Sequence, residues 1–178
     1  MKKVQGMNTF ALHQAIEADA HLESIYQIII QNPESVEYKD QNGRYPLHIA
    51  ASKSEIGLSP QDYQDLVLLL IEAFPEALTE PDNTFNLPLH HACRSGNINM
   101  VLIEAYAVGA PSTLSVENGC GETPLEVAIT SDYSYDEEMI KTFSGMTGEY
   151  EEWRRHSYGE LYRQVTRLLP RENSSEYW

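Results

Sequence analysis

The sequence Pro46-Leu47-His48 recurs along the chain as Pro88-Leu89-His90 and, with its last residue changed, as Pro124-Leu125-Glu126. In each copy the leucine stands 14 residues after another proline, at positions 33 and 47, 75 and 89, and 111 and 125. A looser copy, Ala11-Leu12-His13, precedes the first. Recurrence at a fixed offset indicates one supersecondary unit that is repeated and stacked. Such a stack usually offers a surface rather than a pocket.

Each unit is predicted to contain a loop, a short helix, a turn and a second helix. Proline before Leu-His suits the first turn of a helix, because its missing N–H costs nothing there. Another proline, or a Gly-Ala-Pro turn, ends each second helix. The second helices carry bulky apolar residues at roughly i, i+3, i+4 spacing, which we expect in the core. These are Ile25, Ile28, Ile29, Ile30, Leu66, Leu69, Leu70, Phe74, Met100, Val101, Ile103 and Ala105.

The loops between units, 40–45, 82–87 and 118–123, begin with Asp or Asn and predict tight, projecting turns. With these loops and the recurring motif, the chain resembles the ankyrin repeat family, whose signature is T-P-L-H-x-A. Thr123-Pro124-Leu125 keeps the threonine, whereas Tyr45 and Leu87 replace it. The segment Glu72–Ala77 resembles a long-repeat variant of the family. The resemblance covers about residues 5–131 and implies an all-α solenoid that binds proteins.

We predict a single domain over residues 1–178, with units at about 5–39, 40–81, 82–117 and 118–170 and a tail at 171–178. Tyr158 precedes Pro170 by 12 residues, as Tyr63 precedes Pro75, so 158–169 is predicted to be the second helix of the fourth unit. Inserts are expected between the helices of units two and four, at about 54–59 and 132–157.

Both inserts contain a predicted helix start. Ser59-Pro60 is typical of an N-cap followed by proline at the first helical position. A second possible start lies at residues 134–137, inside the larger insert. This insert is rich in aromatic residues and arginine, which dominate protein–protein hot spots. It is predicted either to cover the end of the stack or to recognise a partner. The residues concerned are Tyr133, Tyr135, Phe143, Tyr150, Trp153, Arg154 and Arg155.

Charge is spread unevenly along the chain. The net charge is −15 over 178 residues, and residues 54–140 hold fifteen acidic residues against one basic residue, Arg94. Such a field repels phosphate backbones, so nucleic acid is not expected as a partner. The longest apolar run, Leu66–Ile71, is too short for a membrane span. Two cysteines make no disulfide framework, which favours an intracellular protein, cytoplasmic or nuclear, and we expect a monomer.

Only one cluster resembles a metal or catalytic site, His90-His91-Ala92-Cys93. Zinc needs four ligands, or three and water, and no second pair lies nearby in sequence. The resemblance instead implies that His48 and His90 hydrogen-bond within the turn, and Cys93 is expected in the core. We therefore predict no cofactor, no metal and no catalytic activity. The alternative is a hydrolase or metal-dependent enzyme that uses His90, His91 and Cys93, or the insert of unit four. A third hypothesis is a purely structural spacer without a specific partner.

The resemblance also implies where a protein partner binds, namely at the loop tips and the exposed side of each first helix. Phe85 stands where the family usually has glycine, and it is expected to be an exposed anchor or to pack on a neighbouring loop. Basic residues at the tips suggest that an acidic peptide could bind there. The predicted partner-binding residues are Gln41, Asn42, Arg44, Ser52, Lys53, Asn83, Thr84, Phe85, Asn86, Arg94, Ser95 and Glu122. Gly119, Cys120, Thr130 and Ser131 occupy equivalent positions in the fourth unit.

Overall fold

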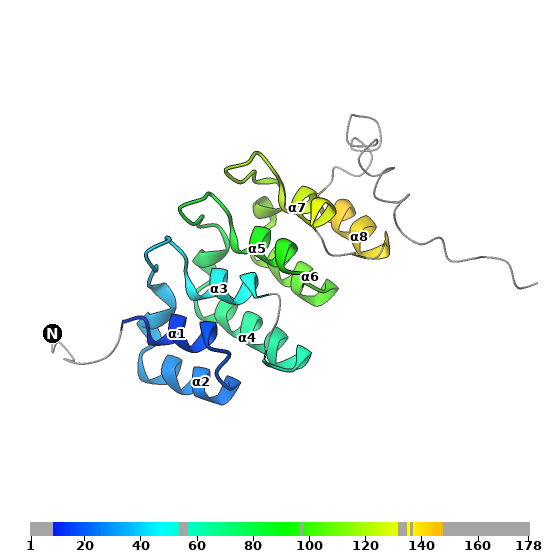
Figure 1. Cartoon of the computed structure of the whole chain (residues 1–178). Coiled ribbons are helices and arrows are strands. Elements are labelled where there is room, and N and C mark those ends of the chain that lie inside the picture. Colours follow the sequence, from blue (N-terminus) through cyan, green and yellow to red (C-terminus); the bar gives the residue numbers. More distant parts are fainter. Residues whose placement is uncertain (1–8, 54–56, 97, 132–134, 136, 148–178) are drawn as a thin grey trace, which may run out of the picture.

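The computed structural model describes residues 9–53, 57–96, 98–131, 135 and 137–147, and these contain α-helices and short 3-10 helices with no strand among them. The first helices of the four units are α1 (Ala11–Glu17), α3 (Pro46–Ser52), α5 (Pro88–Ser95) and α7 (Pro124–Thr130). The second helices are α2 (Leu22–Gln31), α4 (Pro60–Ala73), α6 (Met100–Gly109) and α8 (Glu137–Thr147). Figure 1 shows the two rows of helices, with the loops projecting along one side of the stack, beyond the starts of α3, α5 and α7. The predicted all-α solenoid is confirmed.

Proline and polar caps begin the helices as the sequence predicts. Pro46, Pro60, Pro88 and Pro124 are the first residues of their helices. The Ser59 hydroxyl accepts a hydrogen bond from the Asp62 N–H at 3.1 Å, as its N-cap position predicts. Asn99 caps α6 in the same way, through the Leu102 N–H at 3.0 Å.

The prolines that follow the second helices have a role that the sequence did not predict. They begin three short 3-10 helices, η1 (Pro33–Glu37), η2 (Pro75–Leu78) and η3 (Pro111–Ser115). Each buries an apolar residue at its fourth position, Val36, Leu78 or Leu114, at 4% exposure or less. The 3-10 turn therefore ends the helix and also adds a side chain to the core between units.

The core runs along the stack between the two rows of helices. The motif leucines Leu12, Leu47, Leu89 and Leu125 are all at most 2% exposed. Two residues predicted in the core lie outside it, because Ile30 is 67% exposed and Val101 is 47% exposed. Three consecutive isoleucines, 28 to 30, cannot all face one side of a helix. On α6, Ile103 is in the core as predicted, and Leu102 fills it in place of Val101, each at 0% exposure.

The fourth unit differs from its predicted form. Helix α8 contacts α6 and α7, so it occupies the place of a second helix within the segment interpreted as an insert. Two aromatic residues of this segment pack in the core, Tyr135 at 8% exposure and Phe143 at 1%, and the Tyr135 hydroxyl donates to the Cys93 carbonyl at 2.7 Å. These two residues therefore cover the end of the stack. The predicted helix at 158–169, and the insert residues Tyr133, Tyr150, Trp153, Arg154 and Arg155, lie outside the described residues.

Candidate functional site

Each projecting loop is organised by the acidic or amide side chain that begins it. Its Oδ1 accepts hydrogen bonds from the backbone N–H groups two and four residues later, at 2.8–3.0 Å, and its own N–H donates to the carbonyl four residues later. The residues that do this are Asp40, Asp82 and Asn118. Because one side chain satisfies the turn from within, the outer residues of the loop are left to face solvent.

Backbone hydrogen bonds join neighbouring loops into one continuous row. The Asn83 N–H donates to the Asn42 carbonyl at 2.9 Å, and the Gly119 N–H donates to the Thr84 carbonyl at 3.2 Å. We call the exposed residues of these loops the tip row. It consists of Gln41, Asn42, Asn83, Thr84, Phe85, Gly119, Cys120 and Gly121. None of the eight carries a charge, so the row is a neutral strip on an acidic molecule.

Phe85 is the one large apolar residue of the tip row, and its side chain is 64% exposed. Its φ is +61°, in the left-handed region, and the equivalent residues of the neighbouring loops are Gly43 at +74° and Gly121 at +77°. A residue with a Cβ loses roughly 1–2 kcal/mol in this conformation. The chain thus holds an aromatic side chain in solvent where glycine would fit without strain. The expected exposure of Phe85 agrees with this geometry, although the edge of its ring also lies beside Gly119 of the next loop, and its role as an anchor stays a prediction.

The basic residues predicted to bind a partner are engaged within the stack. Arg44 lies 2.7 Å from Asp40 and 3.2 Å from Glu17. Lys53 lies 2.9 Å from Asp19 and also donates to the Glu17 carbonyl at 2.8 Å, at the end of α1. The contacts with Glu17 and Asp19 hold unit two against unit one, whereas Asp40 belongs to the same loop as Arg44. They also neutralise the cations that an acidic peptide would need.

Arg94 is the most exposed of the three predicted cations. Its guanidinium lies 3.7 Å from the Glu122 carboxylate, and its side chain is 47% exposed. A pair at this distance and exposure contributes little to stability. Glu122, which was also predicted to bind a partner, is therefore close to a cation of the stack itself.

Two predicted partner-binding residues are buried, and these assignments were wrong. Asn86 is 8% exposed, and its side-chain oxygen accepts from the Asn118 amide at 3.0 Å, which ties two loops together. Ser95 is 4% exposed, and its hydroxyl donates to the Ala92 carbonyl at 3.0 Å. Ser52 is partly buried and donates in the same way to the Ile49 carbonyl at 2.9 Å. The sequence marks these positions as polar, but it does not show that the polarity is used internally.

The recurring histidines hydrogen-bond within their own turn (His48), to the next loop (His13) or to both (His90). The His90 Nδ1 accepts from the Leu87 N–H at 3.0 Å, so the neutral ring carries its proton on Nε2, which lies 3.0 Å from the Glu122 carbonyl. His48 receives the Tyr45 N–H at 3.2 Å, and the His13 Nε2 lies 3.2 Å from the Arg44 carbonyl. The predicted hydrogen bonds of His48 and His90 within the turn are confirmed.

The histidine–cysteine cluster has no free set of ligands. Both nitrogens of His90 are used in the hydrogen bonds above, and the His91 Nε2 lies 2.8 Å from the Asp82 carboxylate. Cys93 is fully buried, and this burial raises the pKa of its thiol. No group of three or more His, Cys, Asp or Glu residues that could hold a metal ion occurs in the part of the chain that the structure describes. The geometry therefore gives the enzyme alternative no support at this cluster.

Burial dominates the protonation of the central polar group, which consists of Asp82, His91 and His48. Burial, with a smaller contribution from the nearby His91, lowers the pKa of His48 to about 4. Burial also lowers the pKa of His91 more than the Asp82 carboxylate raises it. For Asp82 itself burial acts to raise the pKa, but hydrogen bonds from Thr84, His91 and Asn86 outweigh it and bring the pKa to about 2. Near pH 7 the group is a neutral imidazole pair with one carboxylate.

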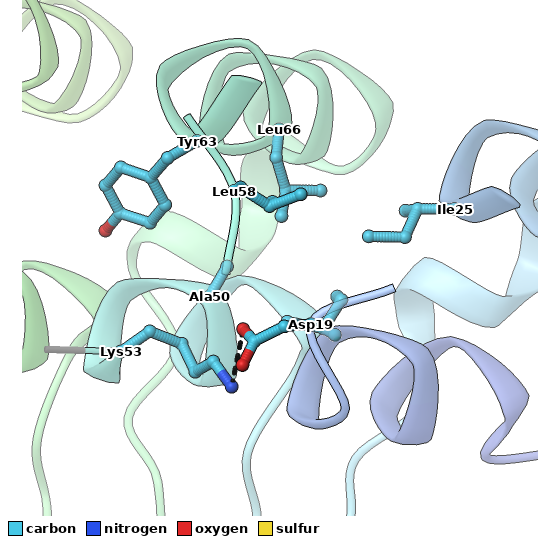
Figure 2. A pocket seen from close by; sticks show the side chains of 8 residues that line it. Asp19, Ile25, Ala50, Lys53, Leu58, Tyr63 and Leu66 are labelled. Carbon is cyan, nitrogen blue, oxygen red and sulfur yellow. Dashed lines mark ion pairs between the residues drawn. The ribbon is translucent and has the colours of Figure 1, made fainter. Parts of the chain in front are cut away.

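A small cleft lies between units one and two, on the side away from the tip row. Ile16, Ile25 and Leu66 form its apolar wall, Leu58 from the predicted insert at 54–59 covers it, and the Asp19–Lys53 ion pair lies at its edge (Figure 2). Its volume of about 10 Å³ holds no more than about one water molecule. The cleft is therefore a packing feature between two units and not a ligand site.

Comparison with known proteins assigns the family. A family model described as ankyrin repeats (3 copies) matches residues 12–103, which is more than half of the chain. The chain belongs to the ankyrin repeat family. The resemblance predicted from its loops and recurring motif is confirmed, and ankyrin repeats are modules for protein interaction.

The curated relatives that match this chain are much longer proteins. The chain is 33% identical over 120 residues to a palmitoyltransferase, ZDHHC13, of Mus musculus, and 33% identical over 132 residues to ZDHHC13 of Homo sapiens. These matches cover 65% and 71% of this chain but only 17% and 19% of the relatives. The chain thus spans about a fifth of the length of the curated relatives that it matches. No described helix of this ankyrin stack is long and apolar enough to cross a membrane.

Proposed function

We propose that this ankyrin stack binds a protein partner through the tip row and the adjoining exposed side of its first helices, with Phe85 as the central anchor. The observation that carries the proposal is the conformation of Phe85, an exposed aromatic residue at φ +61° between loops that have glycine at the same position. Local strain of this kind persists where the surrounding structure enforces it, and it is concentrated at functional sites. The loop hydrogen bonds on both sides supply that enforcement.

The chemistry of the surface favours an uncharged partner segment over an acidic one. Arg44 and Lys53 are held by carboxylates of the stack, and the tip row has no charge of its own. An apolar side chain of the partner can pack on Phe85, while amide and hydroxyl groups such as those of Asn83 and Thr84 can hydrogen-bond to its backbone. The acidic peptide suggested by the sequence is therefore replaced by a neutral, partly apolar segment.

The proposal assigns no catalytic activity to the stack and places it inside the cell. The palmitoyltransferase activity named for the relatives is not carried over, because the match covers only 17–19% of their length. Two free cysteines, one buried and one exposed, suit a reducing compartment. Nucleic acid is not proposed as a partner, since eighteen acidic residues oppose five basic ones in the described part of the chain.

Phe85→Gly should separate binding from stability. Glycine adopts the left-handed conformation without strain, so we expect the free energy of unfolding to stay level or to rise by up to about 1 kcal/mol. Partner binding should fall strongly, because the anchor side chain is lost. Urea unfolding followed by circular dichroism measures the first effect. Affinity capture from a lysate of the native cell, with quantification of each retained protein, measures the second.

A matched variant makes this comparison decisive. Phe85→Tyr keeps the ring and adds only a hydroxyl that faces solvent, so it should retain the proteins that the unaltered chain retains. If Phe85→Gly retains the same proteins at the same level as Phe85→Tyr, the tip row is not the binding surface. If neither variant nor the unaltered chain retains any specific protein, the spacer reading is favoured instead.

A further inference from the structure

The outward side of α6 presents apolar side chains to solvent. Val101 is 47% exposed and Val108 is 83% exposed, and their spacing of seven residues places them on one side of the helix. Glu104 and the partly buried Ala105 lie between them. We call these four residues the outer face of α6. No other second helix shows two exposed large apolar residues within the described ranges.

The described part of the stack also has an excess of negative charge. It contains eighteen acidic and five basic residues, and each of the five basic residues lies within 4.0 Å of a carboxylate. Carboxylates without such an ion pair remain on the second helices, among them Glu72 and Glu104 on neighbouring helices that contact each other. The outer face of α6 therefore fits an apolar segment that carries positive charge.

One segment of this same chain has that composition. Residues 153–171 contain five arginines and one glutamate, whereas the chain as a whole carries −15. Leu161, Val165, Leu168 and Leu169 follow i, i+4, i+7, i+8 spacing, which predicts an apolar stripe on a helix. The segment lies outside the described residues. Its predicted place as the second helix of unit four is already filled by α8.

We propose that residues 153–171 dock on the outer face of α6, with the leucine stripe against Val101 and Val108. Five residues separate α8 from Trp153 and can span up to about 17 Å, which exceeds the 8–10 Å between packed helices. Since α8 contacts α6, a segment of this length that starts at the end of α8 can lie beside α6. The end of the stack is the less suitable surface, because α7 and α8 have no exposed large apolar side chain in the described ranges.

The spacing of the arginines distinguishes those that act in docking from those that do not. The proposed docked helix extends the predicted one at 158–169 back to residue 154, so Arg154, seven residues before Leu161, would share its side, with Arg155 at the flank. Both can reach carboxylates such as Glu104 beside the valines. By the same helical spacing Arg163 and Arg167 would lie opposite the leucine stripe, on the side away from α6. The two pairs therefore serve as a test pair and a matched control pair.

The rate of cysteine alkylation at position 108 tests the docking in the full chain. Val108→Cys is made in a Cys120→Ser background, so that the exposed native thiol is removed while Cys93 stays buried. Leu161→Ser with Leu168→Ser should raise the alkylation rate at position 108 about tenfold, since a docked segment covers the site most of the time. Arg154→Glu with Arg155→Glu should also raise it. Arg163→Glu with Arg167→Glu should leave it nearly unchanged.

Position 30 provides the matched control site. Ile30 is 67% exposed on α2, at the far end of the stack, so alkylation of Ile30→Cys should be the same with every form of the C-terminal segment. Equal rates at position 108 with and without the leucine substitutions would overturn the proposal. Shielding that grows with protein concentration would overturn it as well, because the contact would then lie between molecules. An equal rise in the alkylation rate at position 108 with both arginine pairs would contradict docking through the leucine side.

Discussion

His90→Ala lowers the free energy of unfolding by about 2–3 kcal/mol, because one buried ring satisfies groups in two units. Its Nδ1 accepts the Leu87 N–H and its Nε2 bonds to the Glu122 carbonyl, with the side chain 0% exposed. Alanine leaves the Leu87 N–H buried without its partner and leaves a cavity between units three and four. An unsatisfied buried donor costs about 1–3 kcal/mol, to which the cavity adds. Urea unfolding at pH 7.5 measures the change.

Glu126→Ala is the matched control for this prediction. Glu126 occupies the same position in unit four, but its carboxylate accepts only from Thr123 of its own loop, at 2.7 Å from the backbone N–H. Loss of this cap should cost only about 1 kcal/mol. Equal losses from the two substitutions would show that the contact of His90 with the next unit contributes nothing to stability.

Acid should destabilise the stack well above the pH at which carboxylates are protonated. The pKa of His48 is lowered to about 4 in the folded chain, against about 6.5 when unfolded, so folding favours the neutral ring. The stability from this preference is present above pH 6.5 and is lost as the pH falls through 4. Between pH 7.5 and 4.5 the free energy of unfolding should fall by about 2–3 kcal/mol. Urea unfolding at the two pH values measures the difference.

Further acidification should remove the contribution of Asp82. Its pKa is lowered to about 2, so its stabilising effect is present above pH 3.8 and is lost between pH 3.8 and 2.

The control for the His48 prediction is His48→Gln, whose unfolding free energy should depend less on pH between 7.5 and 4.5. The account of His48 fails if this variant and the unaltered chain lose the same stability over that interval.

The fold could be predicted from the sequence because its determinants are local and repeated. Proline at the first helical position, Ser59 as a cap, the motif leucines and the turn histidines each act within a few residues of themselves. Repetition then fixes the architecture, since each unit can bury its apolar side only against a copy of itself. Long-range contacts leave no such pattern. The sequence predicted 158–169 as the second helix of unit four, but α8 occupies that place, and this choice depends on packing against α6 and α7.

The candidate site was predicted less well, because composition does not show how a polar side chain is used. The resemblance implied that Asn86 and Ser95 bind a partner, yet both are buried here in hydrogen bonds. Arg44 and Lys53 pair with Asp40 and Asp19, and the Asp19 contact crosses 34 residues of sequence. Phe85 carries a different kind of signal, because it replaces glycine where the turn requires a positive φ, and its exposure follows from that position. A departure from a conformational requirement therefore predicts exposure here better than polarity does.

Photo-crosslinking from the tip row shows whether position 85 touches a protein partner. Phe85 is replaced by a benzoyl-phenylalanine, which keeps an aromatic ring at the site, and Glu72, which is exposed on α4, is replaced in the same way as a control. Both forms are irradiated in lysate of the native cell, and adducts with other proteins are identified by mass. We expect specific adducts from position 85 and none of these from position 72. Specific adducts from position 72 with none from position 85 would contradict binding at the tip row and would place the binding surface on the second helices.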